Sequence, residues 1–180
     1  MADRAEHRLT AAVATAGTAL RSPRAADEAE FIAAVRRSRT LHRPWVSAPD
    51  TPERYATWLD RMQPPSARSF FAIDKTSGAL AGVFNISQIV RGPLQSAYLG
   101  YYAFAGSEGK GHMTRALQAV LRVAFGELKL HRLEANIQPG DARSIALVQR
   151  CGFEREGFSP RYLKIGGRWR DHERWAILRD

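Results

Sequence analysis

Apolar side chains recur along the chain with two different periods, and each change of period marks a change between strand and helix. Short apolar runs bounded by turn-forming residues are typical of strands. The runs of this kind before the C-terminal region are residues 18–23, 69–74, 80–89, 96–104 and 131–138. The middle three follow one another through short turns, which predicts an antiparallel meander. Gly166 and Gly167 separate two further runs and predict a terminal hairpin, because a Gly-Gly pair suits a tight turn.

Apolar positions at helical spacing predict the helices. The first passes through Ala29, Ile32 and Val35. The second begins at Thr51, because threonine caps a helix N-terminus and the proline that follows it fits the first turn. Residues 39–49 lie between these two helices and contain two prolines, so they predict a loop.

The third and longest predicted helix, residues 113–128, has one apolar face. A short fourth helix follows Asp141, a good N-cap residue, and ends before Gly152. The predicted order of elements is therefore β-α-α-β-β-β-α-β-α-β-β. This order predicts an α/β (α+β) fold, in which a mixed sheet carries helices on its faces.

One domain over residues 18–180 accounts for this pattern, with residues 1–17 as a flexible N-terminal tail. No apolar run is long enough to cross a bilayer, and Asp3 and Glu6 argue against a signal peptide. The single cysteine, Cys151, excludes an intramolecular disulfide and fits a reducing compartment. We therefore expect a cytoplasmic protein without a membrane partner.

The chain is strongly basic, with a formal net charge of +9 and a pI of about 10.4. Such a surface attracts anions, for example the ribosome, an acidic protein or a phosphorylated cofactor. The basic residues are scattered along the chain, so a generally basic solvated surface explains the charge equally well. We find no zinc-like Cys/His spacing and no nucleic-acid-binding motif, and we predict no metal site.

Three glycines, Gly106, Gly109 and Gly111, stand where a predicted strand leads into the longest helix. The first N–H groups of a helix lack intrahelical partners, and the helix dipole adds partial positive charge there. Glycine lets the backbone approach a phosphate closely. The segment therefore predicts a pyrophosphate site, although a purely structural turn also explains the glycines. It is not a P-loop, because no Gly-Lys-Ser/Thr sequence ends it.

Several motifs, in order, resemble the Gcn5-related N-acetyltransferase (GNAT) superfamily. They are "GSEGKGHMTRAL", "RLEANIQP" and "DARSIALVQRCGFEREG". The family frame Gln/Arg-x-x-Gly-x-Gly/Ala lacks its leading Gln/Arg here, and Asp141 stands where the later Asn-x-x-Ser motif has asparagine. The resemblance is stronger to ribosomal-protein alanine N-acetyltransferases of the RimJ/RimL type, and strongest to RimJ. The segments that carry it are "HRPW", "GVFNISQIVRG", "YLGY", "HRLEANIQP" and "YLKIGGRWRDH".

This resemblance implies a mostly antiparallel central sheet of about six to seven strands, with a splay between the two central strands and helices on both faces. It also implies acetyl-CoA as the cosubstrate and direct transfer of the acetyl group to an amine in a ternary complex. The residues implied in cosubstrate binding are Tyr102, Ala103, Phe104, Glu108, Gly109, Lys110, Gly111, His112, Met113, Thr114, Asp141 and Ser144.

The amine must attack as a free base. An α-amino group has a pKa near 7.7–8.0 and lysine one near 10.4, so an N-terminal amine manages with a weak base or a water chain. Residues 96–104 contain no carboxylate where lysine-acetylating relatives often have a glutamate, which favours an α-amine acceptor. Glu134 is the candidate base and alternates with Asn136, so both face one side of a strand. A salt-bridged Glu134 is the alternative.

The leaving thiolate needs a proton or a hydrogen bond. Relatives often place a tyrosine at the position of Val148, so that acid is absent here. By resemblance Ser144 is the candidate for the thiol contact, and a serine that only completes the first helical turn is the alternative. Family position also implies His42, Trp45 and Asn85 in acceptor binding, and each has packing as its alternative.

Three functions remain open on the sequence. The first is acetylation of a protein N-terminus, such as that of a ribosomal protein, with possible ribosome association. The second is acetylation of a small amine, such as an antibiotic or a polyamine, because GNAT folds differ in their acceptors. The third is a non-catalytic acyl-CoA-binding regulatory module.

Overall fold

A single eight-stranded sheet organises the protein, in a computed structural model that describes residues 14–179. The strand order is β1-β2-β3-β4-β5-β6-β8-β7. Seven of these strands match the prediction, and the additional one is the two-residue β1 (Ala14–Thr15), which pairs with β2 (Thr18–Arg21). Residues 1–13 of the predicted tail lie outside the described part of the chain.

The predicted meander and terminal hairpin are confirmed. All neighbouring strands from β1 to β5 are antiparallel, as are β6 with β8 and β8 with β7. β8 lies between β6 and β7, so the last strand of the chain enters the sheet instead of extending its edge. The strands not yet given are β3 (Arg68–Asp74), β4 (Leu80–Val90), β5 (Ser96–Ala103), β6 (Arg132–Ile137), β7 (Glu154–Ile165) and β8 (Arg168–Leu178).

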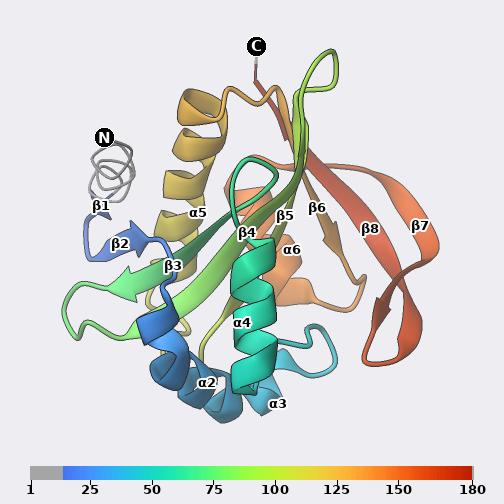
Figure 1. The fold of residues 1–180 in the computed structure, drawn as a ribbon. Helices are drawn as coiled ribbons and strands as arrows, with labels where there is room; N and C mark the ends of the chain where they lie inside the picture. The colour runs from blue at the N-terminus through green and yellow to red at the C-terminus, as the bar shows by residue number, and fades with distance from the viewer. Residues whose placement is uncertain (1–13, 180) are drawn as a thin grey trace.

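Helices cover both faces of this sheet (Figure 1). The face with α2, α3 and α4 buries aromatic residues around Phe31, and the face with α5 and α6 buries the larger aliphatic core around Leu117 and Leu133. The helical segments are η1 (Ala25–Asp27), α2 (Glu28–Arg37), α3 (Arg39–His42), α4 (Pro52–Arg61), α5 (His112–Arg122), the π turn η2 (Val123–Glu127) and α6 (Ala142–Arg150). None of the helices within residues 14–179 has the length and apolar character needed to cross a membrane.

The prediction of a loop over residues 39–49 is wrong in its first part. α3 occupies Arg39–His42, and Pro44 follows it. A proline inside a helix removes one hydrogen bond, because it has no N–H, and its ring clashes with the carbonyl one turn earlier. A proline two residues beyond the helix end therefore leaves this single turn intact.

The central strands β5 and β6 are parallel and separate after three pairs. Ser96 pairs with Arg132, Ala97 with Leu133 and Tyr98 with Glu134, and no further pair forms. β5 nevertheless continues to Ala103, held on its other edge by β4. The predicted splay is thus confirmed, and Figure 1 shows the two strands diverging toward the end of the sheet where α3 lies.

A close packing contact holds the start of α5 against the sheet at the splay. Gly82 of β4 lies beneath Met113, and a Cβ on Gly82 would clash with the Met113 sulfur and come within 2.8 Å of the Tyr102 carbonyl. Real Cβ atoms do not approach backbone oxygens so closely, so glycine is required here. This contact positions the loop before α5 beside the end of β5.

Candidate active site

A cleft of about 1570 Å³ opens where β5 and β6 separate. Residues from β5, α3, the loop before α5, β6, α6 and the terminal hairpin line it. The predicted site residues that the cleft brings together are His42, Trp45, Asn85, Tyr102, Ala103, Glu108, Gly109, Gly111, His112, Met113, Thr114, Asn136, Asp141 and Ser144. Phe104, Lys110 and Glu134 do not line it.

The glycine loop ends in a helix N-terminus with free backbone donors. Gly109 and Gly111 have φ of 72° and 74°, in the left-handed region that glycine adopts without steric cost. Gly111 is the N-cap of α5 and provides no side-chain cap. The N–H groups of residues 109–114 donate no hydrogen bond of good geometry to any described residue. A diphosphate is the kind of ligand that such a cluster of N–H groups binds.

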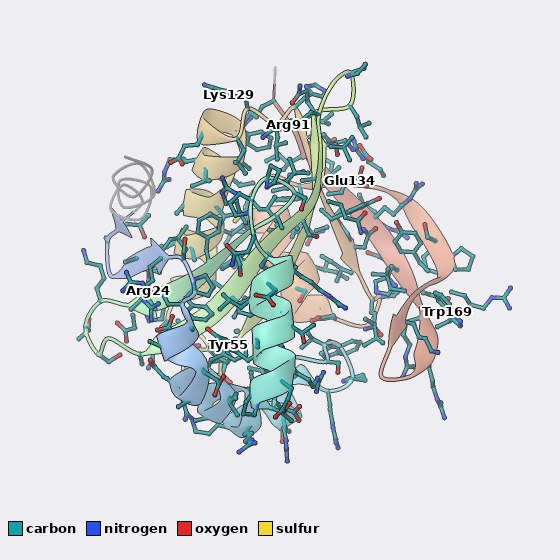
Figure 2. The ribbon with its side chains drawn as sticks, in the orientation of Figure 1. Arg24, Tyr55, Arg91, Lys129, Glu134 and Trp169 are labelled. Atoms are coloured by element: carbon teal, nitrogen blue, oxygen red, sulfur yellow. The ribbon has the colours of Figure 1, made fainter. Side chains whose placement is uncertain are left out.

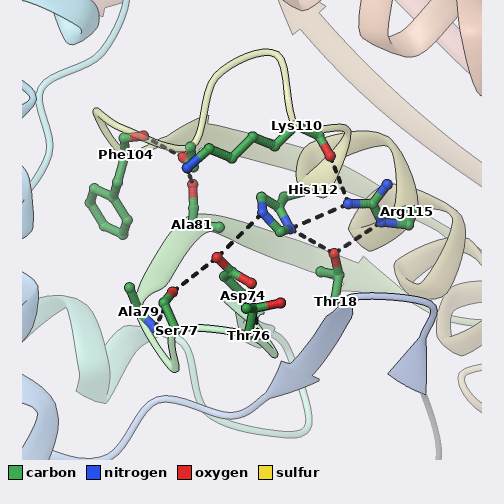
Figure 3. A network of polar contacts seen from close by, with 11 residues as sticks. Thr18, Asp74, Thr76, Ser77, Ala79, Ala81, Phe104, Lys110, His112 and Arg115 are labelled. Carbon is green, nitrogen blue, oxygen red and sulfur yellow. Dashed lines mark hydrogen bonds and ion pairs between the residues drawn. The ribbon is translucent and has the colours of Figure 1, made fainter.

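Side chains behind the loop hold it in place (Figure 3). Arg115 donates from Nη2 to the Lys110 carbonyl at 2.7 Å and from Nε to Thr18 Oγ1 at 3.2 Å. His112 is buried, with Nδ1 2.9 Å from Thr18 Oγ1 and Nε2 3.7 Å from an Asp74 carboxylate oxygen. The side chain of His112 therefore anchors α5 to β2 and β3, and only its backbone N–H is left for a ligand.

The carboxylate of Glu108 belongs to the loop itself. It accepts a hydrogen bond from the Gly106 N–H at 2.6 Å. Hydrogen bonds from backbone N–H groups, its own first, lower the pKa of this carboxyl group, so it is ionised at neutral pH. Glu108 thus stabilises the loop, and its negative charge does not suit direct contact with a phosphate.

Comparison with known proteins identifies the family. The model of the acetyltransferase (GNAT) domain matches residues 18–154. The chain belongs to the GNAT acetyltransferase family. Over 148 residues it is 36% identical to the [ribosomal protein uS5]-alanine N-acetyltransferase of Escherichia coli, covering 78% of this chain and 76% of the relative.

Two further matches support the assignment. A probable N-acetyltransferase of Bacillus subtilis, YjcK, is 36% identical over 126 residues, which are 70% of each chain. The structure of Mycobacterium smegmatis RimJ in complex with CoA-disulfide superposes with a TM-score of 0.81 at 27% identity, over 89% of this chain and 81% of that one. GNAT enzymes transfer the acetyl group of acetyl-CoA, so acetyl-CoA is the cosubstrate.

The charge of the cleft fits the phosphates of this GNAT cosubstrate. Its lining includes five arginines and only two carboxylates, Glu108 and Asp141, among the residues that the structure describes. The arginines are Arg37, Arg43, Arg115, Arg143 and Arg150. With the free N–H groups of residues 109–114, this excess of arginines makes the cleft suited to an anion.

The first turn of α6 contains the later GNAT motif. Asp141 accepts hydrogen bonds from the Ser144 N–H at 3.1 Å and from the Ser144 hydroxyl at 2.7 Å. The Ser144 carbonyl accepts from the Tyr101 hydroxyl at 2.9 Å. Ser144 lines the cleft, but its hydroxyl hydrogen is used in the helix cap, as in the alternative that the sequence left open. Burial raises the pKa of the Tyr101 phenol, so it stays protonated.

The three residues predicted to bind the acceptor lie on the α2–α4 side of the cleft. His42 Nε2 donates to the Ala103 carbonyl at 2.9 Å, and burial lowers the pKa of its imidazole. Trp45 packs against Gly140, and its carbonyl accepts from the Gln138 side chain at 3.1 Å. Asn85 accepts a hydrogen bond from the Ser69 hydroxyl at 2.6 Å. Residues far apart in sequence thus form one wall.

The prediction that Glu134 is the catalytic base needs correction. Glu134 and Asn136 share one face of β6, as predicted, but Glu134 forms an ion pair with Arg132 at 2.7 Å, and Arg132 also binds Glu156. Glu134 is paired with Tyr98, which is the last β5–β6 pair before the splay. It therefore lies where the two strands are still joined (Figure 2). Asn136 is two residues further along and lines the cleft, where its buried Oδ1 has no partner among the described residues.

The sequence analysis missed His172 of β8, which is only 3% exposed and also lines the cleft. Its strand was recognised as half of a hairpin, and local periodicity gives no sign that this hairpin returns beside β6. One signal in the sequence could have indicated His172. The segment "YLKIGGRWRDH", which resembles RimJ-type acetyltransferases, ends on this histidine.

Proposed function

We propose that the chain transfers the acetyl group of acetyl-CoA to the N-terminal α-amine of a protein, such as a ribosomal protein, by direct transfer in a ternary complex. One observation carries this choice of acceptor. Among the described lining residues, the only carboxylates are Glu108 and Asp141, and both are engaged on the cosubstrate side. Among the described residues, the acceptor wall around His42, Asn85 and Asn136 contains no carboxylate, and burial lowers the pKa of the His42 imidazole.

A wall without carboxylates favours a monoamine acceptor. Polyamines and aminoglycosides carry several positive charges, and their desolvation in a cleft requires anionic partners. A lysine side chain needs a stronger base than an α-amine, because its pKa is about 2.5 units higher. The 36% identity to a relative that is a [ribosomal protein uS5]-alanine N-acetyltransferase supports the same class of acceptor.

The basic surface supports an approach to an anionic assembly such as the ribosome. Residues 161–170, at the tip of the β7–β8 hairpin, contain four cations and no acid. Trp169 lies in this tip and is 61% exposed (Figure 2). Leu163 and Ile165 of the same tip line the cleft, so a docked partner would bring its N-terminus close to the acceptor wall. A cytoplasmic location is part of this proposal.

The residues divide by role along the cleft. We assign the diphosphate of acetyl-CoA to the N–H groups of residues 109–114, and its pantetheine arm to the free edge of β5 at Tyr102 and Ala103. We assign the acceptor to His42, Trp45, Asn85 and Asn136. The phenol of Tyr101 and the first turn of α6 at Ser144 lie on the α6 side of the cleft, where the thiol would leave.

A competition assay tests the acceptor. Peptides that begin with Ala or Ser and contain one internal lysine are incubated with the full-length protein and acetyl-CoA, and the acetylated nitrogen is located by mass spectrometry. Spermidine and an aminoglycoside are assayed in parallel through thiol release. We expect the α-amine to react at least about tenfold faster than the lysine. Acetylation of lysine alone, or of spermidine in preference to every peptide, would overturn the proposal.

A further inference from the structure

His172 combines burial with one unused nitrogen. Its Nδ1 lies 2.9 Å from the Arg170 carbonyl oxygen. A carbonyl can only accept, so Nδ1 carries the hydrogen and Nε2 carries the lone pair. Within residues 14–179, Nε2 has no hydrogen-bond partner, yet it is not among the fully enclosed unpartnered atoms. The small accessible part of this ring therefore opens to the cleft that the residue lines.

Asn136 brings a second unpartnered acceptor to the same face of the sheet. In the β6–β8 register Asn136 is opposite Arg174, and His172 is the next residue of β8 on that face. Diagonal neighbours of this kind are about 7–8 Å apart, which leaves room for one small group between the side chains. A buried acceptor without a donor is rare in folded proteins and calls for an explanation, such as a ligand that donates to it.

We propose that His172 Nε2 is the proton acceptor for the incoming amine, and that Asn136 Oδ1 orients this amine beside the splay. The assignment rests on the proposed α-amine acceptor. It replaces the role that the sequence analysis gave to Glu134, and it identifies two uncharged groups that accept hydrogen bonds from the incoming ammonium ion.

The proton balance of the reaction is complete with these groups. The ammonium gives one proton to His172 Nε2, and the neutral nitrogen then attacks the acetyl carbonyl carbon. The carbon–sulfur bond breaks and the new carbon–nitrogen bond remains. The second proton of the attacking nitrogen goes to the leaving thiolate, and the imidazolium of His172 releases the first to solvent.

The surroundings keep His172 available as a base. Burial is the main cause that lowers the pKa of its imidazole, against smaller opposing effects of the Arg170 carbonyl and Asp171. Tyr162 of β7 contacts the ring, and a hydrogen bond between Tyr162 and Tyr98 of β5 helps raise the pKa of Tyr98 to about 12. Asn136 of β6 and Gln138, which directly follows β6, contribute neutral amides, while Arg170 and Arg174 share the face on β8.

The strength of this base suits an α-amine. With an imidazole pKa below 6.5, proton transfer is unfavourable by at least about 15-fold from an α-ammonium and by roughly 10⁴-fold from a lysine. His172 therefore supports the N-terminal acceptor and discriminates against lysine. His42, also on the cleft with a lowered pKa, has its Nε2 hydrogen committed to Ala103.

The test compares His172→Asn with wild type, since the Asn amide retains the donor to the Arg170 carbonyl and removes the base. The kcat/KM for an Ala-initiated peptide is measured from pH 6 to 9, together with the affinity for acetyl-CoA. We expect a loss of about 100-fold at pH 7. The loss should shrink to about 10-fold or less at pH 9, where most α-amine is already neutral, and acetyl-CoA affinity should not change.

His131→Asn is the matched control, because His131 also directs Nδ1 to a backbone carbonyl, that of Arg179, but lies outside the cleft. A loss in His172→Asn that is the same at every pH, or no loss, overturns the assignment. If that variant does not fold, His172→Gln is measured in its place. If neither folds, a wild-type kcat/KM that does not fall below about pH 6.5 overturns it. A wild type that acetylates only a small amine refutes the proposed function, and the same comparison with that amine still decides the role of His172.

Discussion

His42 on α3 donates a hydrogen bond from Nε2 to the carbonyl oxygen of Ala103 at 2.9 Å, across 61 positions of sequence. Ala103 is the last residue of β5 and is paired with Gly82 of β4. The His42 ring also contacts Tyr102, with ring centroids 5.1 Å apart. One histidine thus joins the helical layer that carries the proposed acceptor wall to the splayed strand.

Replacing His42 by phenylalanine keeps a ring and removes the donor. The Ala103 carbonyl then loses its partner, and we expect a loss of about 1–2 kcal/mol in the free energy of unfolding. The KM for the peptide acceptor should rise more than kcat falls, because the wall shifts while the reacting groups stay. Denaturant unfolding and steady-state kinetics measure both effects. His42→Gln, whose amide can still donate, should recover most of the stability, and equal damage in both variants would contradict this role.

Buried histidines make stability depend on pH below neutrality. Burial lowers the pKa values of His42 and His172. The unfolded chain therefore binds protons at a higher pH than the folded chain, so stability is full above about pH 6.5 and falls as pH drops through the folded pKa values. We expect the thermal midpoint to decrease between pH 7 and 5. The double variant His42→Gln, His172→Asn should have a flatter profile, and an unchanged slope would show that other groups control it.

The limits of the sequence analysis are clearest at β6. An alternating strand puts Glu134 and Asn136 on one face, and this was correct. Only the register with β5 shows that the splay begins between them, and register is a long-range property that periodicity does not contain. The insertion of β8 beside β6, and hence the position of His172, was hidden for the same reason.

Local signals, in contrast, predicted local structure well. Thr51 accepts a hydrogen bond from the Arg54 N–H and Asp141 accepts one from the Ser144 N–H, as N-caps do. The glycine loop leads into the longest helix as predicted, and its backbone at Gly109 and Gly111 is left-handed. These features depend on a few consecutive residues, so they can be predicted without the topology of the sheet.

Glu134→Gln tests whether Glu134 acts as a general base. Glu134 binds Arg132 at 2.7 Å and does not line the cleft. Arg132 keeps its second partner, Glu156, so we expect stability to fall by no more than about 1 kcal/mol. The kcat/KM for a peptide should stay within about threefold of wild type at pH 7. A loss as large as about 100-fold, the size of a general-base effect, would restore Glu134 as the base.

Arg115→Met removes the support behind the glycine loop. Arg115 binds the Lys110 carbonyl and Thr18 together, and its aliphatic part is retained by methionine. Since the loop N–H groups depend on this support for their common direction, we expect acetyl-CoA to bind about tenfold more weakly, by roughly 1.4 kcal/mol. Calorimetry measures the affinity. Arg122→Met, on the exposed side of the same helix, is the control and should bind as wild type does.

Gly109→Val tests the anion site itself. Gly109 has φ of 72°, and valine tolerates that region poorly, so the backbone must turn and the N–H groups of residues 109–114 lose their arrangement. Gly78→Val is a matched control, because Gly78 has φ of 75°, also has open space around its Cβ position, and lies in the β3–β4 turn outside the cleft. Both variants should lose similar stability, about 1–3 kcal/mol. Only Gly109→Val should abolish acetyl-CoA binding in calorimetry, so equal affinities in the two variants would show that the loop backbone does not bind the diphosphate.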